Sequence, residues 1–131
     1  MMFYVIDTHP LVWYLSKAPD KLPKNIDEIL KSSERGDCII FIPTIVLAEC
    51  YYLSENRKIE LDFGNILDAI ENSSNFLVAP FNIDIIGLFP KIRIKEIHDK
   101  IIAATAKLLN ATLITKDRKI RESKIIDTIW D

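Results

Sequence analysis

Four of the 19 acidic residues stand at expected strand ends or in apolar surroundings, where a charged side chain needs a reason. They are Asp7, Glu49, Asp99 and Asp117. A buried carboxylate is strongly unfavourable unless it is paired with a cation or bound to a metal. If the four lie together, their charges repel, and such oxygen donors suit Mg²⁺ or Mn²⁺. A divalent ion held by carboxylates suits the hydrolysis of a phosphodiester bond.

Three of these acids also have a structural explanation that the sequence leaves open. Asp7 follows the apolar run Phe3–Ile6 and opens an expected helix, where aspartate is a favourable N-cap. Asp99 begins another expected helix, where its charge favours the helix dipole. Asp117 stands two residues after Thr115, where it suits a turn.

Glu49 is harder to explain by structure alone. It is the only charged residue between Ile45 and Leu53, in a segment with the composition of a helix that is apolar nearly all round. We expect such a helix to be buried, with Glu49 facing something polar. A single structural ion pair and a ligand site both meet that requirement.

The elements that must position these acids alternate between short β-rich runs and helical segments, within 131 residues that make one domain. Strands without polar alternation, separated by helices, favour the α/β class, with a parallel sheet of about five strands flanked by helices. Functional groups in such sheets gather at the carboxyl ends of the strands. We expect strands at Phe3–Ile6, Cys38–Ile42, Phe76–Ala79, Thr112–Thr115 and Ile125–Trp130, and helices at Thr8–Lys17, Ile26–Arg35, Pro43–Arg57, Asp62–Ser73, Ile83–Phe89 and Asp99–Leu109.

Composition excludes several classes of protein. With 49% hydrophobic and 27% charged residues, the chain is not a disordered one. The longest uncharged run, Asn72–Ile83, has 12 residues and is too short to span a bilayer. No basic residue precedes Lys17, so we expect no signal peptide. Cys38 and Cys50 lie in apolar runs and are expected to be reduced, in a cytoplasmic protein.

Positive charge is concentrated in one segment. Residues 91–124 contain ten lysines and arginines against four acids, a balance of +6, whereas the rest of the chain carries −8. Lys116, Arg118, Lys119 and Arg121 follow an expected strand and are candidates to contact the phosphates of a polyanion. A solvated turn explains the same charges. The aromatic residues Trp13, Tyr14, Tyr51 and Tyr52 are candidates for base stacking, or for core and dimer contacts.

The sequence resembles the PIN-domain ribonucleases, most closely the VapC-type toxins of toxin–antitoxin systems. The resemblance covers nearly the whole chain and rests on segments in the family's order: Tyr4–His9, Pro43–Glu49, His98–Ala106, Leu113–Arg118 and Ile126–Trp130. It implies a three-layer α/β/α fold. It also implies that the four acids are catalytic and hold one or two Mg²⁺ or Mn²⁺ ions, while Thr8 and Thr115 support them through hydrogen bonds.

By the same resemblance, the substrate is RNA and the protein is a homodimer. A cognate antitoxin inhibits such proteins by inserting a segment over the acidic pocket, often with a basic side chain. The alternative is a non-catalytic PIN-fold module that binds RNA or protein. A phosphatase of the haloacid dehalogenase type needs Asp-x-Asp after its first strand, but here Thr8 and His9 follow Asp7. A receiver domain needs a pair of acids near the N-terminus, but no acid pair precedes the run Phe3–Ile6.

Overall fold

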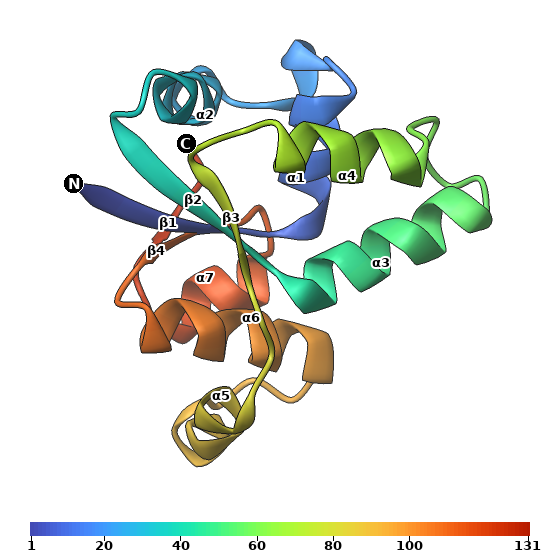
Figure 1. Ribbon diagram of the computed structural model, residues 1–131. Coiled ribbons are helices and arrows are strands. Elements are labelled where there is room, and N and C mark those ends of the chain that lie inside the picture. The colour runs from blue at the N-terminus through green and yellow to red at the C-terminus, as the bar shows by residue number, and fades with distance from the viewer.

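The computed structural model describes residues 1–131 apart from the side chain of Pro19, and its centre is one parallel sheet. The five strands stand in the order β3-β2-β1-β4-β5 (Figure 1). They are β1 (Met2–Ile6), β2 (Cys38–Pro43), β3 (Phe76–Ala79), β4 (Thr112–Ile114) and β5 (Thr128–Ile129). The expected α/β class and parallel sheet are therefore confirmed, although β5 is shorter than the run Ile125–Trp130 suggested.

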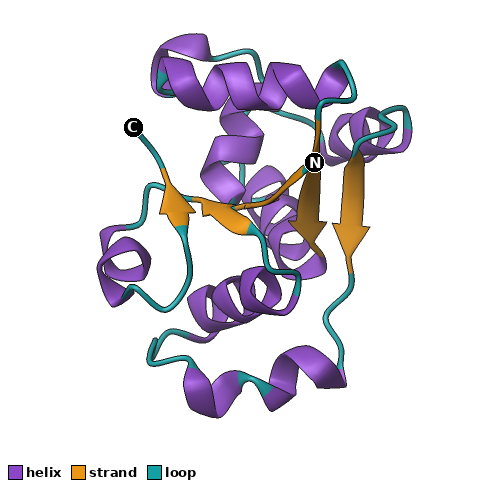
Figure 2. Cartoon of the chain, turned by 90° about the vertical axis from the view of Figure 1, so that its left-hand side faces the viewer, coloured by secondary structure: helices purple, strands orange, loops and turns teal.

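Helices cover both faces of the sheet, so the molecule has three layers (Figures 1 and 2). The helices are α1 (Thr8–Leu15), α2 (Lys24–Glu34), α3 (Thr44–Glu55), α4 (Phe63–Glu71), α5 (Ile83–Gly87), α6 (Ile97–Leu108) and α7 (Arg118–Ser123), with short 3-10 helices at Pro19–Lys21 and Phe89–Lys91. In Figure 1, α1, α2 and α4 lie above the sheet, and α5, α6 and α7 lie below it. Helix α3 extends sideways from the end of β2. No helix in the described part of the chain is long and apolar enough to cross a membrane.

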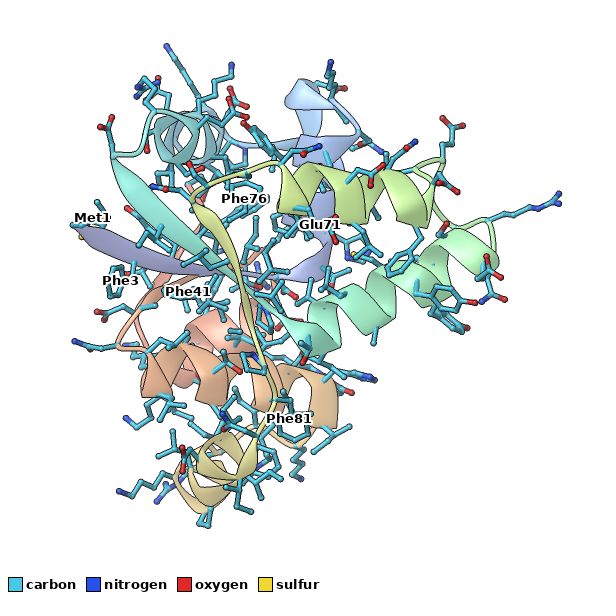
Figure 3. The ribbon with its side chains drawn as sticks, viewed as in Figure 1. Met1, Phe3, Phe41, Glu71, Phe76 and Phe81 are labelled. Atoms are coloured by element: carbon cyan, nitrogen blue, oxygen red, sulfur yellow. The ribbon has the colours of Figure 1, made fainter. Side chains whose placement is uncertain are left out.

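The core is formed mainly by branched aliphatic side chains from the central strands and the helices that pack on them. Val5 and Ile6 of β1 are fully buried, as are Leu113 and Ile114 of β4. The amino end of β1 is less covered. Phe3, on β1, packs edge to face against Phe41 of β2, with ring centroids 5.5 Å apart (Figure 3).

Two sequence expectations about helices are wrong. Arg118, Lys119 and Arg121 do not lie in a turn, because Asp117 caps a helix, α7, that the sequence pattern did not reveal, whereas Lys116 lies in the connection before it. Helix α3 is not buried, since only Val46 and Cys50 are fully covered, and Tyr51 and Tyr52 are 51% and 60% exposed. The reason is geometric: α3 packs on α1, α4 and α6 but projects beyond the sheet, so part of its apolar surface is not covered in this chain.

Strand register brings the two ends of the chain together. β1 lies between β2 and β4, and Ile6 pairs with Ile114. The residues that follow, Asp7 and Thr115, are therefore neighbours at the carboxyl edge of the sheet. The backbone N–H of Asp7 donates to the Ile114 carbonyl at 3.0 Å, which fixes this arrangement.

Candidate active site

Asp7 is held at the end of β1 by two hydrogen bonds. Its Oδ1 accepts from the Thr8 backbone N–H at 2.8 Å, and its Oδ2 accepts from the Thr115 hydroxyl at 2.6 Å. Asp7 is thus the N-cap of α1, as the structural explanation expected. Burial raises the pKa of Asp7 and outweighs these two bonds, which lower it. Each carboxylate oxygen has two lone pairs, so an oxygen that accepts one hydrogen bond can still bind a cation.

Asp7, Glu49, Asp99 and Asp117 are together called the acidic edge. Like Asp7, Asp117 is both a helix cap and a member of this group. Its Oδ1 accepts from the Ile120 N–H at 3.0 Å and so begins α7. Its own N–H donates to Thr115 Oγ1 at 3.0 Å. The Thr115 hydroxyl therefore links Asp7 to Asp117, and it is fully buried while doing so. The hydrogen-bonding role expected for Thr115 is present in the structure.

Asp99 lies in the first turn of α6 but does not cap it. That helix begins earlier than expected, at Ile97, because Glu96 is the N-cap and its Oε2 accepts from the Asp99 N–H at 2.8 Å. The other oxygen of Glu96 contacts Nδ1 of His98 at 3.1 Å. Sequence reasoning missed Glu96, although an acid placed three residues before a second acid at a helix start was an available signal.

The four acids influence each other electrostatically. Partial burial, together with repulsion from Asp117, Glu96, Asp7 and Glu49, raises the pKa of Asp99 to about 6. Glu49 reaches this group from α3, the helix that packs on α6. No basic side chain in the described residues forms an ion pair with any of the four acids. The lone ion pair considered for Glu49 is therefore not found there.

The chemistry of these four donors suits a divalent cation, but their side chains do not converge on one point. All the candidate donors are oxygens, half-buried, mutually repelling and without a basic partner, which is the set that hard cations prefer. However, no three acidic, histidine or cysteine side chains among the described residues converge on one point. Thr8 Oγ1 is buried with no hydrogen-bond partner in the described structure. Its supporting role stays a prediction, as does metal binding by the four acids.

Two pockets flank the acids. One has a volume of about 360 Å³ and is lined by Asp7, His9, Pro10, Trp13, Lys116 and Asp117. We call it the acidic pocket. The second, of about 360 Å³, lies between α3 and α6 and is lined by Ala48, Glu49, Tyr52, Leu53 and His98. Asp7 and Asp117 therefore border one open space and Glu49 borders another.

Of the candidate RNA-binding residues, only Lys116 lines the acidic pocket. Its ammonium lies 5.7 Å from the centre of the Trp13 ring. Arg118 and Arg121 lie on α7 and approach Glu122 at 3.8 Å and Asp131 at 3.9 Å, whereas Lys119 is exposed on the same helix. The four residues do not form one patch at the acids.

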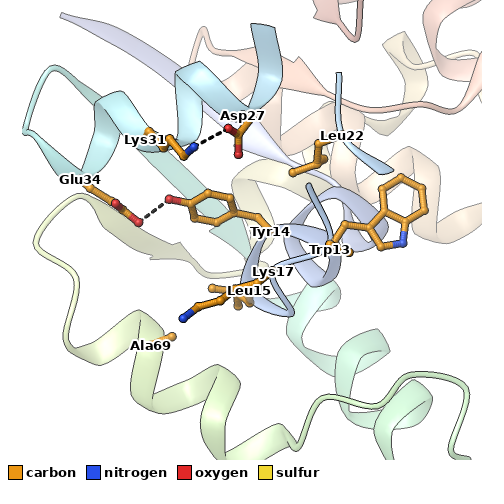
Figure 4. Close-up of a pocket in the computed structure, with 10 residues that line it drawn as sticks. Trp13, Tyr14, Leu15, Lys17, Leu22, Asp27, Lys31, Glu34 and Ala69 are labelled. Carbon is orange, nitrogen blue, oxygen red and sulfur yellow. Dashed lines mark hydrogen bonds and ion pairs between the residues drawn. The ribbon is translucent and has the colours of Figure 1, made fainter. Parts of the chain in front are cut away.

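The described aromatic candidates also differ in position. Trp13 borders the acidic pocket and contacts His9 and Trp130, with ring centroids 5.7 Å and 6.2 Å away. Tyr14 instead donates a hydrogen bond to Glu34, on the α2 side of the molecule (Figure 4). Tyr51 and Tyr52 stay exposed on α3.

Comparison with known proteins identifies the family of this chain. The model of the PIN domain family matches residues 4–125, and the chain belongs to that family. The comparison with curated proteins found no match.

Solved structures similar to this chain come from several toxin–antitoxin complexes. VapBC2 from Rickettsia felis, bound to a promoter DNA fragment, is similar with a TM-score of 0.73 and 25% identity, covering 99% of this chain and 100% of that chain. DNA-bound VapBC from Salmonella typhimurium has a TM-score of 0.71 and 19% identity, covering 98% of both chains. FitAcB from Neisseria gonorrhoeae has a TM-score of 0.61 and 19% identity, covering 96% of both chains. The resemblance to VapC-type PIN proteins inferred from sequence is thereby confirmed.

Proposed function

We propose that this chain is a metal-dependent endoribonuclease and the toxin of a VapBC-type toxin–antitoxin pair, acting in the cytoplasm as a homodimer. PIN domains are generally nucleases, and the similar structures include VapBC complexes. The observation that carries the proposal is the acidic edge. There Asp7, Asp99, Asp117 and Glu49 come from separate elements to positions where their charges repel, without a basic partner among the described residues.

The residues of this edge have distinct roles in the proposal. Asp7, Glu49, Asp99 and Asp117 would hold Mg²⁺ or Mn²⁺. When bound, the ion supplies an activated water and neutralises charge on the phosphate. Thr115 orients Asp7 and Asp117 through its two hydrogen bonds. Glu96 fixes the start of α6 and so the position of Asp99.

The experiment is cleavage of a structured RNA by the purified chain with Mn²⁺, beside a reaction containing EDTA and one with the variant Asp99→Asn. We expect cleavage only in the first. Glu28→Gln is the matched control, because Glu28 is an exposed acid on α2, and it should cut like the wild type. Cleavage that persists in EDTA or in Asp99→Asn would contradict the proposal.

The alternative, a non-catalytic module, predicts a different result. RNA would then bind with measurable affinity but stay intact with Mn²⁺. Asp99→Asn would leave the affinity unchanged or raise it, because a negative charge is removed. Trying several structured RNAs guards against a narrow target, and binding without cleavage by any of them would favour the module.

The antitoxin partner is the second part of the proposal, and a large groove on the other side of α1 supports it. This groove, of about 530 Å³, lies between α1, α2 and α4 and is lined mostly by apolar atoms (Figure 4). At one side, Lys31 pairs with Asp27 at 2.8 Å. Trp13 borders both the groove and the acidic pocket. A segment with apolar side chains in the groove would therefore pass directly to the carboxylates.

This part is tested by co-purification with the product of the neighbouring reading frame. Ala69→Tyr places a large side chain in the groove and should abolish the complex without reducing RNA cleavage. Asn65→Tyr, at an exposed position of the same helix outside the groove, should retain it. An intact complex with Ala69→Tyr would show that the groove is not the docking surface.

A further inference from the structure

Lys116 occupies an unusual position for a lysine beside carboxylates. It follows Thr115, whose buried hydroxyl points to Asp7, and its own side chain is exposed and lies over the indole ring of Trp13. Lys116 and Asp117 line the same pocket as Asp7. Yet, within the described residues, the Lys116 ammonium forms an ion pair with neither acid.

Trp13 is suited to hold this ammonium in place. The Lys116 Nζ lies 5.7 Å from the ring centre, within the range of a cation–π attraction. The indole is itself supported from below by Trp130, which is only 7% exposed. A lysine stem has four rotatable bonds, so a fixed aromatic face reduces the freedom that a phosphate contact would otherwise have to remove.

The other basic side chains near the end of β4 are less suited to this task. Arg118 and Arg121 each lie near an acid of their own segment, Glu122 and Asp131. Lys119 lies on α7 and does not line the pocket. Lys116 is thus the basic residue of this segment whose charge faces the space beside Asp7.

We propose that Lys116 binds a phosphate of the RNA next to the bond that is cut, and that Trp13 is the positioning residue that holds its ammonium there. The inference rests on the proposed nuclease function and adds to it one substrate contact outside the carboxylates. A phosphate contact from a lysine contributes affinity without reading base sequence.

The test measures the affinity of a fluorescein-labelled single-stranded RNA of mixed sequence by anisotropy, in the Asp99→Asn background so that RNA stays intact. Lys116→Ala should weaken binding about fivefold at low salt. It should also reduce the slope of log affinity against log salt by about 0.7, as expected for one lost contact to a single strand. Lys107→Ala, at an exposed site in the last turn of α6, should change neither quantity.

The role of Trp13 is tested by rescue and by a double-mutant cycle. Trp13→Leu should weaken binding about threefold, whereas Trp13→Phe, which keeps an aromatic face, should retain most of it. In a chain that already carries Lys116→Ala, Trp13→Leu should add no further loss. A merely structural tryptophan would instead give the same loss in both backgrounds, and melting curves identify variants that fail to fold.

Each outcome bears on a separate claim. If the wild type cuts RNA but Lys116→Ala leaves both affinity and salt slope unchanged, this inference is wrong and the nuclease proposal stands. If the chain neither binds nor cuts RNA, the nuclease proposal fails and the Lys116 contact falls with it. Equal effects of Lys116→Ala and Lys107→Ala would mean that Lys116 acts only through general surface charge, and the inference would be wrong.

Discussion

Asp99 illustrates how a single residue can be unfavourable for the fold while it suits a cation. Its carboxylate is partly buried and is repelled by Asp117, Asp7 and Glu49. We expect Asp99→Asn to abolish cleavage and yet to leave the metal-free protein as stable as the wild type, or more stable by about 0.5–1 kcal/mol. Urea denaturation at neutral pH measures this difference. A variant that unfolds would show instead that Asp99 is needed for structure.

The same residue makes stability depend on pH. The folded-state pKa of Asp99 is about 6, against an ordinary value of 3.8, so protonation favours the folded state. Its contribution is fully present below pH 3.8 and is lost as the pH rises through 6. Metal-free wild type should therefore gain about 1 kcal/mol relative to Asp99→Asn between pH 7 and pH 5. Parallel profiles of stability against pH for the two proteins would show that Asp99 does not cause this pH dependence.

Residue types and their places in the sequence were enough to select the four acids, because each stands at an element boundary or in an apolar run. Their functions in the structure are less exclusive than the sequence suggested. Asp7 and Asp117 are caps as well as members of the acidic edge, and Glu96, not Asp99, caps α6. Side-chain partners of this kind depend on which turn a helix begins in, and propensity does not resolve a shift of two residues.

Among the elements, α7 depends most directly on one acid. Asp117→Ala removes the bond to the Ile120 N–H and should lower stability by about 1 kcal/mol. Asp117→Asn retains an acceptor at the N-cap and should stay near wild-type stability. Both should lose cleavage, since both remove the negative charge. Thermal melting separates the two effects, and equal destabilisation by Asn and Ala would mean that charge, and not capping, stabilises α7.

The strands and most helices followed from local patterns, α3 among them, whereas the exposure of α3 and the presence of α7 did not. Apolar runs bounded by polar residues mark β1 to β4 well, since a central parallel strand is buried on both faces. The apolar composition of α3 led to the wrong expectation of burial, because composition does not tell which molecule covers an apolar face. The basic sequence of α7 gave no periodic signal over its six residues.

Metal binding should appear as a property of the whole molecule. A cation that binds only the folded acidic edge raises the free energy of unfolding, by about 2.7 kcal/mol when its concentration is one hundred times its dissociation constant. We expect Mn²⁺ to raise the melting temperature of the wild type and to have a much smaller effect on Asp7→Asn. An equal shift in both proteins would place the ion elsewhere.

A second property of the whole molecule is its exposed apolar surface. Around β3, α5 and the end of α6, the side chains of Leu77, Val78, Phe81, Ile83, Ile86 and Leu108 are exposed (Figure 3 labels Phe81). Patches of this kind mark interaction surfaces. If this is the homodimer surface, Ile83→Lys should shift the protein to monomer in light scattering. Ile83 is 75% exposed, so the fold should lose less than about 0.5 kcal/mol.

Leu67→Lys, at a 36% exposed position of α4 outside this patch, is the control and should leave the oligomeric state unchanged. A dimer that survives Ile83→Lys would direct attention to Tyr51 and Tyr52 on α3, another exposed apolar surface.

The pairing of β1 with β4 has a consequence for the protein during its synthesis. Asp7 is synthesised before Thr115, whose hydroxyl orients it, and the two residues are separated by 108 positions. Contacts so distant along the chain form late in folding. A nascent chain therefore carries no complete acidic edge until residue 117 has emerged. The nuclease activity proposed here is therefore delayed until that part of the chain has been made.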